Sequence, residues 1–239
     1  MTLQDATILA YKLCVYTWMV TYVALIWRGM KDRSYGMPIL ALALNLTWEL
    51  IFLAFLPPQG SLDSALVSHG ALKAQIVFAV CLALDAGILY TYFRFGYKYF
   101  AESYGLTRAQ WIGYSVALLV FSFLAIHACA VFFMQFDSYF HRDQIEAAKL
   151  IAFIQNAVMS LAFVAMFHMR RSIEGQSFTI AWTKFLGSSL TVGPLYLAQH
   201  PDNYFAWVII GTMFLADVWY MGLIWGALRR AGINPLTRF

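Results

Sequence analysis

Three carboxylic acids in this sequence stand inside long apolar runs: Glu49, Asp85 and Asp217. An ionisable group near the centre of a bilayer costs about 2.5–3.5 kcal/mol on the insertion scale, so such groups mark functional sites or helix contacts. Burial in a medium of low dielectric disfavours the charged form of an acid. We therefore expect at least one of the three to be neutral at neutral pH, able to give a proton to an alkene or an epoxide oxygen.

The neighbours of Glu49 fit such a role. Asn45 precedes Glu49 by four positions and Phe52 follows it by three, so on a helix these three side chains share one face. The Asn45 amide is a candidate for orienting the carboxyl group. A second acid such as Asp85 could orient the donor or balance positive charge that develops in the reaction.

Aromatic side chains are abundant and lie close to the acids. They make up 18% of the residues, and Phe214 and Tyr220 flank Asp217 at three positions on either side. The face of an aromatic ring stabilises a cation and offers no nucleophile that would quench it. The candidate wall of a cation-stabilising pocket consists of Trp18, Trp48, Phe52, Phe214, Trp219 and Tyr220.

The composition shows which kind of fold must position these groups. The chain has 239 residues, of which 62% are hydrophobic and 12% are charged, about half the charged fraction of a soluble domain. The formal net charge of +4 comes from residues in short connections, which argues against nucleic-acid binding. We therefore expect an all-α polytopic integral membrane protein, with residues 1–239 forming one domain.

Seven segments are long and apolar enough to cross a hydrocarbon core of roughly 30 Å. At a rise of about 1.5 Å per residue, the three acids fall near the middle of three different spans. That shared depth predicts a common site. The predicted spans are residues 7–28, 37–57, 73–96, 110–134, 145–168, 178–199 and 204–228.

The basic residues of the connections predict the orientation of the chain, because cytoplasmic connections are rich in Lys and Arg. The connections after the odd-numbered spans carry most of these residues, whereas the opposite connections offer only Lys73 and Arg142. We expect an external or luminal N-terminus and a cytoplasmic C-terminus. Three lysines stand inside predicted spans, and each is expected to be a packing residue or an anchor that reaches the membrane surface along its long side chain: Lys12, Lys149 and Lys184.

The sequence contains no phosphate loop, metal-ligand cluster or Asp-rich motif for a diphosphate and magnesium. If the protein is a cyclase, protonation is therefore the expected initiating step, with no cofactor and no metal. The alternative is a proton-coupled seven-helix carrier or receptor, in which the three acids would form a relay. A purely structural membrane partner is the third possibility.

Two short stretches and the span pattern resemble a known family, the small seven-span terpene cyclases of meroterpenoid pathways. These are known from pyripyropene-type biosynthesis in fungi, with bacterial relatives that act on farnesylated indoles. The similarity covers most of the chain and is carried mainly by Tyr35-Gly36-Met37-Pro38 and Asn45-Leu46-Thr47-Trp48-Glu49.

The resemblance implies a catalytic acid pair, Glu49 and Asp217, that protonates the terminal epoxide or alkene of a prenyl chain and drives its cationic cyclisation. The implied substrate is a prenylated aromatic or indole compound, with a farnesyl chain as the expected prenyl group. A prenyltransferase, and an epoxidase where the trigger is an epoxide, are the implied neighbours in the pathway. The implied location is the endoplasmic reticulum in a eukaryote and the cell membrane in a bacterium.

Overall fold

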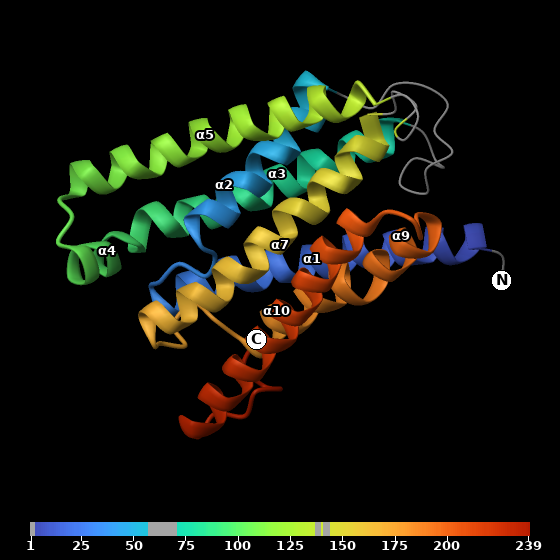
Figure 1. Cartoon of the computed structure of the whole chain (residues 1–239). Helices are drawn as coiled ribbons and strands as arrows, with labels where there is room; N and C mark the ends of the chain where they lie inside the picture. The colour runs from blue at the N-terminus through green and yellow to red at the C-terminus, as the bar shows by residue number, and fades with distance from the viewer. Residues whose placement is uncertain (1–2, 57–70, 137–139, 141–143) are drawn as a thin grey trace.

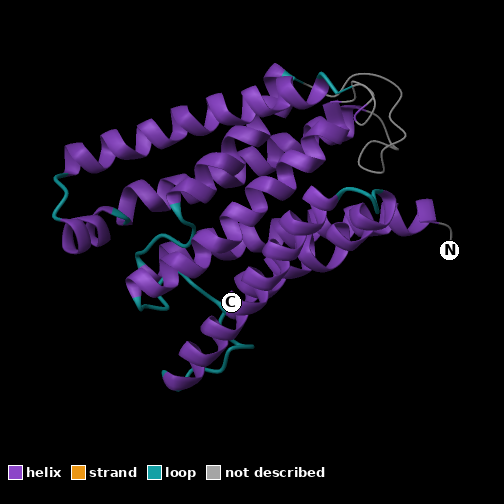
Figure 2. Ribbon diagram, in the orientation of Figure 1, coloured by secondary structure: helices purple, strands orange, loops and turns teal. Residues whose placement is uncertain are grey.

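The computed structural model describes residues 3–56, 71–136, 140 and 144–239. Every regular segment in these residues is helical, as Figure 2 shows. The all-α fold class is thereby confirmed. Arg142 and the side chain of Lys73, which entered the prediction of orientation, lie outside the described residues.

The helices follow one another along the described parts of the chain (Figure 1). Two of the segments, η1 and η2, are π-helices. The order is α1 (Leu3–Asp32), α2 (Ile39–Leu50), η1 (Ile51–Phe55), α3 (Ala71–Phe95), α4 (Tyr97–Tyr104), α5 (Arg108–Met134), α7 (Gln144–Arg170), α8 (Phe178–Lys184), η2 (Phe185–Val192), α9 (Gly193–Gln199) and α10 (Tyr204–Arg230).

Five of the seven predicted spans are single helices long and apolar enough to cross a membrane: α1, α3, α5, α7 and α10. The second predicted span is a shorter apolar helix over Ile39–Phe55. The sixth is helical from Phe178 to Gln199 but changes its helix type twice.

A proline accounts for the change of helix type in the sixth segment. Pro194 stands at the start of α9, and it has no N–H group to donate to the carbonyl group one turn earlier. The turns before it form the π-helix η2, a wider helix type that occurs in short pieces and often at functional sites. The segment therefore presents its side chains in a register that a regular α-helix would not give.

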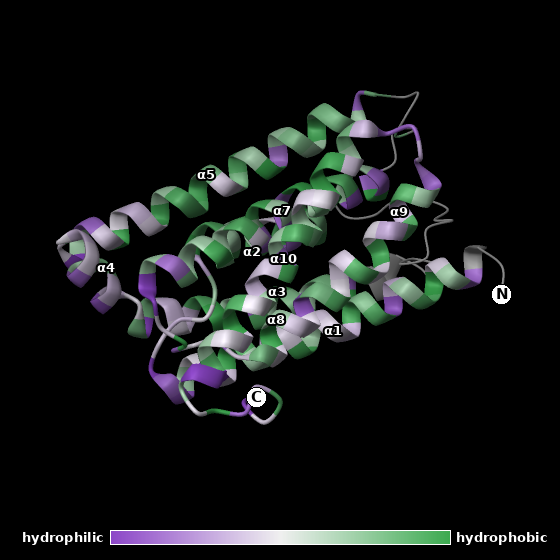
Figure 3. Ribbon diagram, turned by 60° about the horizontal axis from the view of Figure 1, so that its bottom comes forward, coloured by the Kyte–Doolittle hydropathy of each residue, from purple (hydrophilic) through white to green (hydrophobic). Residues whose placement is uncertain are grey.

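The central helix of the bundle is α7. Of its most apolar stretch, 61% is buried, compared with 17% for α5. The α7 helix packs against α10, α2 and α5, and α5 turns an apolar outer face away from the other helices (Figure 3). A helix that exposes so much apolar surface is typical of contact with lipid.

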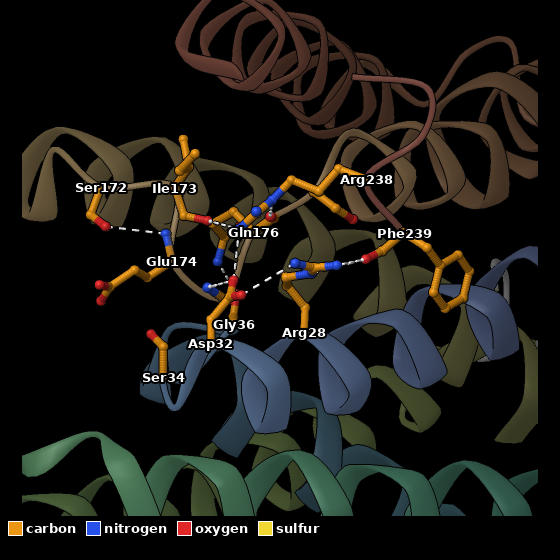
Figure 4. Close-up of polar contacts among 12 residues, drawn as sticks. Arg28, Asp32, Ser34, Gly36, Ser172, Ile173, Glu174, Gln176, Arg238 and Phe239 are labelled. Atoms are coloured by element: carbon orange, nitrogen blue, oxygen red, sulfur yellow. Dashed lines mark hydrogen bonds and ion pairs between the residues drawn. The ribbon is translucent and has the colours of Figure 1, made fainter. Parts of the chain in front are cut away.

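Polar side chains gather at one end of the bundle, where the connection after α1 meets the connection after α7 and the end of the chain (Figure 4). Asp32 accepts hydrogen bonds from the Gly175 N–H (2.9 Å) and from the Arg238 guanidinium (2.7 Å). The Nε atom of Arg28 donates to the Phe239 carbonyl oxygen at 2.9 Å. The connections predicted to be cytoplasmic therefore share one end of the structure.

Candidate active site

A partly open cavity of about 130 Å³ lies between α1, α2, α3, α7 and η2. Its wall is mostly apolar and aromatic, with a few polar side chains, which is the usual make-up of a small-molecule site. The lining residues are Tyr11, Cys14, Val15, Trp18, Tyr22, Asn45, Trp48, Glu49, Val77, Phe78, Cys81, Ile145, Ala148, Lys149, Ala152, Phe153, Gln155, Asn156, Ser188 and Val192.

Glu49 brings a carboxyl group to this cavity. Its side chain is almost completely buried, and the Cys81 side chain forms a hydrogen bond with it. Its second oxygen, Oε2, has no hydrogen-bond partner among the described residues. Because buried polar atoms are nearly always paired, an unpaired carboxyl oxygen in a residue that lines a cavity calls for an explanation, and a ligand would supply one.

Asn45 links Glu49's helix to the second predicted acid. Its Nδ2 atom donates to Oδ2 of Asp85 and to the Tyr22 hydroxyl oxygen, both at 2.7 Å. Asp85 itself is fully buried and does not line the cavity. The amide therefore holds Asp85 directly, and it shares a helix face with Glu49 one turn away.

A second polar group lies on η2 and α7. The indole Nε1 of Trp18 donates to the Ser188 hydroxyl oxygen at 2.9 Å, and the Asn156 amide donates to the same oxygen at 3.4 Å. Ser188, Trp18 and Asn156 all line the cavity. These contacts join α1, α7 and η2 across the cavity wall.

Two of the predicted aromatic residues line the cavity, Trp18 and Trp48. The indole of Trp48 donates to the Ala148 carbonyl oxygen at 3.2 Å and meets the Phe78 ring edge to face at 5.3 Å between centroids. Phe52 packs against the Trp48 ring at 5.3 Å but does not line the cavity. It therefore supports the wall from behind.

Asp217, the third predicted acid, does not line the cavity. Its Oδ1 atom pairs with the Lys184 ammonium group, and the Ser189 hydroxyl donates to its Oδ2 atom at 2.7 Å. The Lys184 ammonium group also donates to the Ser160 hydroxyl oxygen at 2.5 Å. Of the two roles expected for Lys184, the structure shows packing and not an anchor at the membrane surface, because the side chain is 1% exposed and its charge is matched inside the bundle.

The other residues predicted around Asp217 also stay away from the cavity lining. Phe214 packs on Phe185 at 5.3 Å between ring centroids. Trp219 is 55% exposed and lies against His168 on the outside of the helix. Tyr220 is buried, and its hydroxyl donates to the Gln176 side chain. The structure thus gathers Glu49 and Asn45 in one place and puts the group around Asp217 in another.

The π-helix η2 connects these two places. Ser188 faces the cavity, and the next residue, Ser189, donates to Asp217. The contact between Asp217 and Ser189 therefore fixes the segment that carries one wall of the cavity.

Several lining residues were absent from the predicted site, among them the rings Tyr11, Tyr22, Phe78 and Phe153. The lining residues on α7 could have been found from the sequence by their spacing. Ile145, Ala148, Lys149, Ala152 and Asn156 follow one another at intervals of three, one, three and four residues. That spacing places them on one face of a helix.

The arrangement can deliver a proton into an apolar space. A buried acid loses the solvation that stabilises its carboxylate, so it holds its proton until an acceptor arrives. Rings on the wall then stabilise positive charge on a hydrocarbon, whereas water would trap it. The cavity therefore suits chemistry that begins with protonation and proceeds through carbocations.

Comparisons with known proteins identify the family of this chain. The family model of the Pyr4-like transmembrane terpene cyclases matches residues 2–230. No solved structure matches the chain.

Curated relatives carry the same description. The Pyr4-family terpene cyclase mfmH of Annulohypoxylon moriforme is 28% identical over 77% of this chain and 66% of its own length. Terpene cyclase ptmB of Penicillium ochrochloron is 27% identical over 74% of this chain and 64% of its own length. Terpene cyclase pyr4 of Aspergillus fumigatus is 26% identical over 89% and 83%, respectively.

The chain spans slightly less than two thirds of the length of mfmH and ptmB. The family model, in contrast, matches nearly all of this chain, including every residue of the cavity wall. The family resemblance of the two short stretches is confirmed. The chain belongs to the Pyr4-like transmembrane terpene cyclases.

Proposed function

We propose that this protein cyclises the prenyl part of a prenylated aromatic or heteroaromatic compound, with farnesyl as the expected chain. The observation that carries the proposal is the Glu49 carboxyl group, buried in an aromatic cavity with one oxygen unpaired among the described residues. The relatives, which are named terpene cyclases, support it.

Glu49 gives its proton to the terminal epoxide oxygen or alkene of the prenyl chain. The electron pair of the next double bond then forms a carbon–carbon bond, and the positive charge moves along the chain as rings close. The cavity rings, Trp18 and Trp48 among them, stabilise the cations by their faces. Loss of a proton from the last cation ends the reaction, so substrate and product are isomers.

Asn45, Asp85 and Asp217 support this reaction from outside the reacting atoms. Asn45 and Asp85 fix the α2–α3 contact beside Glu49 through their 2.7 Å hydrogen bond. Asp217 holds η2, and with it Ser188, through Lys184 and Ser189. In this proposal Glu49 is the proton donor, and Asp217 is a positioning residue.

Product analysis of the Glu49→Gln variant tests the proposal. The membrane protein is supplied with farnesylated indoles and farnesylated phenols, each with and without a terminal epoxide, and products are identified by mass spectrometry and NMR. Loss of a general acid lowers the rate by about 10²–10⁴-fold. Glu102→Gln, which changes an exposed acid on α4, is the matched control. Normal cyclisation by the Glu49→Gln variant would refute the role of the acid.

The topology of the chain is part of the proposal. We propose seven spans with an external or luminal N-terminus and a cytoplasmic C-terminus, as the basic connections indicate. Single cysteines at Asp202→Cys and Thr237→Cys, on either side of α10, are placed in a chain whose native cysteines are serines. A membrane-impermeant maleimide should label only the first in intact cells. The reverse pattern, or labelling of both, would contradict this orientation.

A further inference from the structure

Two amide-bearing residues of α7 line the cavity and have unpaired side-chain acceptors. Gln155 and Asn156 line the cavity, and their side chains are 3% and 8% exposed. The side-chain carbonyl oxygens of both, like Oε2 of Glu49, have no hydrogen-bond partner among the described residues. Leaving one such atom unpaired in a protein interior costs about 1–3 kcal/mol. The two amide oxygens, beside a carboxyl group that gives its proton, therefore indicate a ligand on which a hydrogen-bond donor is created.

A chain of hydrogen bonds fixes which way the Gln155 amide points. The Asn45 amide nitrogen donates to Asp85 at 2.7 Å, so the Asn45 carbonyl oxygen faces the other way, toward Gln155. Gln155 must then present its nitrogen to that oxygen, at 3.4 Å. Its own carbonyl oxygen remains for the cavity.

Asn156 is oriented from the other side of the cavity. Its amide nitrogen donates to the Ser188 hydroxyl oxygen at 3.4 Å, beside the indole N–H of Trp18, which donates to the same atom. This leaves the Asn156 carbonyl oxygen as an acceptor. The two amides follow one another on α7, and each is held by a different neighbour, so the pair is built into the wall.

We propose that Gln155 and Asn156 form an acceptor pair that binds the O–H group created when Glu49 protonates an oxygen atom at the end of the prenyl chain. This rests on the proposed function. In this proposal, Gln155 and Asn156 select substrates whose prenyl chain carries oxygen at its end. The cavity volume of about 130 Å³ is close to that of an engineered cavity of ~150 Å³ that holds benzene, so it fits one branched chain end.

The step balances as an isomerisation. The Glu49 proton moves to the epoxide oxygen, and the bond from that oxygen to its more substituted carbon breaks. The oxygen keeps that electron pair and becomes a hydroxyl group, while the neighbouring alkene supplies the electrons of the new carbon–carbon bond. The hydroxyl hydrogen is donated to the carbonyl oxygen of Gln155 or Asn156. The proton that the last cation releases returns to Glu49 through solvent.

A substrate that ends in a plain alkene would gain little from the two amide oxygens. Its protonation creates a C–H bond, so neither amide oxygen gains a donor. It also leaves a carbocation beside two amide oxygens, which are nucleophiles able to trap it. Opening of the epoxide develops positive charge on the corresponding carbon, but the O–H group that it creates pairs with an amide oxygen. The pair therefore favours the epoxide over the alkene by interactions made during the reaction.

Variants without the acceptors test the proposal. Gln155→Met, Asn156→Leu and the double variant are compared with wild type on a farnesylated aromatic with and without its terminal epoxide. Each single change should lower kcat/KM for the epoxide about tenfold to hundredfold, the loss expected for a hydrogen bond to a charged group. Turnover of the alkene should not fall. Gln135→Met, which changes an exposed glutamine at the end of α5, is the control for the substitution.

The ratio of epoxide to alkene turnover decides the outcome. An unchanged ratio in a double variant that melts at the wild-type temperature overturns the role of the pair, even when cyclisation itself is confirmed. If wild type converts neither substrate, the proposed function fails, and binding still tests the pair. A saturated prenyl analogue with a secondary alcohol at the corresponding carbon should then bind wild type about tenfold more tightly than its hydrocarbon counterpart, and the double variant without preference. Equal binding to wild type refutes the pair.

Discussion

The ammonium group of Lys184 and the carboxylate of Asp217 form an ion pair inside the helix bundle, with side chains 1% and 2% exposed. The two residues come from α8 and α10, and hydroxyl groups of Ser160 and Ser189 complete their hydrogen bonds. Removal of one partner from such a pair leaves an uncompensated buried charge, whereas replacement of both by apolar groups is often tolerated.

Asp217→Asn and Lys184→Met should therefore each destabilise the protein by about 3–5 kcal/mol. The double variant Lys184→Met/Asp217→Leu should recover most of that loss and regain cyclase activity. Unfolding in detergent, followed by circular dichroism, gives the stability, and product formation gives the activity. A double variant that is stable but inactive would mean that Asp217 takes part in proton transfer, contrary to its proposed positioning role.

Asn45 offers a similar test on the other side of the cavity. Asn45→Leu removes the donor to both Asp85 and Tyr22, and each group left unpaired costs about 1–3 kcal/mol. The double variant Asn45→Leu/Asp85→Leu should lose less stability than the sum of the two single variants, because they remove the same interaction. Strict additivity in the same unfolding experiment would show that the hydrogen bond contributes nothing.

Gly187 sets the distance between η2 and α1. A methyl group on its Cα would lie 2.7 Å from the Thr17 hydroxyl oxygen and 3.0 Å from Cδ1 of Trp18. Gly187→Ala should cost about 1–3 kcal/mol through overpacking, and the displaced Trp18 should lower product formation by up to about 10²-fold. Thermal unfolding of the purified protein gives the loss of stability, and product analysis gives the loss of activity.

Gly211, on α10, is the control for that change. A methyl group there meets no atom within 4 Å, so Gly211→Ala should be neutral or stabilising by up to about 1 kcal/mol. Equal behaviour of the Gly187→Ala and Gly211→Ala variants would show that the α1–η2 spacing does not matter.

The helices themselves could be predicted from the sequence because a long apolar run is a local property. The same holds for the shared face of Asn45 and Glu49, which depends only on a spacing of four residues. Depth along a helix axis also follows from counting residues. These local rules are enough to identify Glu49 as a buried acid with an amide beside it.

The rotation of each helix about its own axis could not be predicted in this way. Counting placed Asp217 at the right depth to meet Glu49, but packing turns its side chain toward Lys184 and Ser189. Trp219, two positions along, then faces outward, since residues two apart do not share a helix face. The π-helix η2 adds a change of register that no periodic pattern contains.

Glu174, at the polar end of the bundle, gives a prediction for the effect of pH on stability. The Tyr99 hydroxyl donates to its carboxylate, and this hydrogen bond, helped by the charges of Lys98 and Arg170, holds the pKa of Glu174 below its ordinary value of 4.5. A depressed pKa in the folded state stabilises the protein above 4.5, and the contribution is lost as the pH falls through the lower folded-state value.

Glu174→Gln should therefore lower the melting temperature at about pH 6, and the difference from wild type should shrink as the pH falls to about 3. Because the side chain is 48% exposed, solvent screens the interaction, and we expect less than about 1 kcal/mol. Glu102→Gln, at an exposed position of α4, is the matched control for the substitution. A gap between wild type and the Glu174→Gln variant that stays constant over the whole range would contradict the assignment of the stabilising contact to the ionised carboxylate.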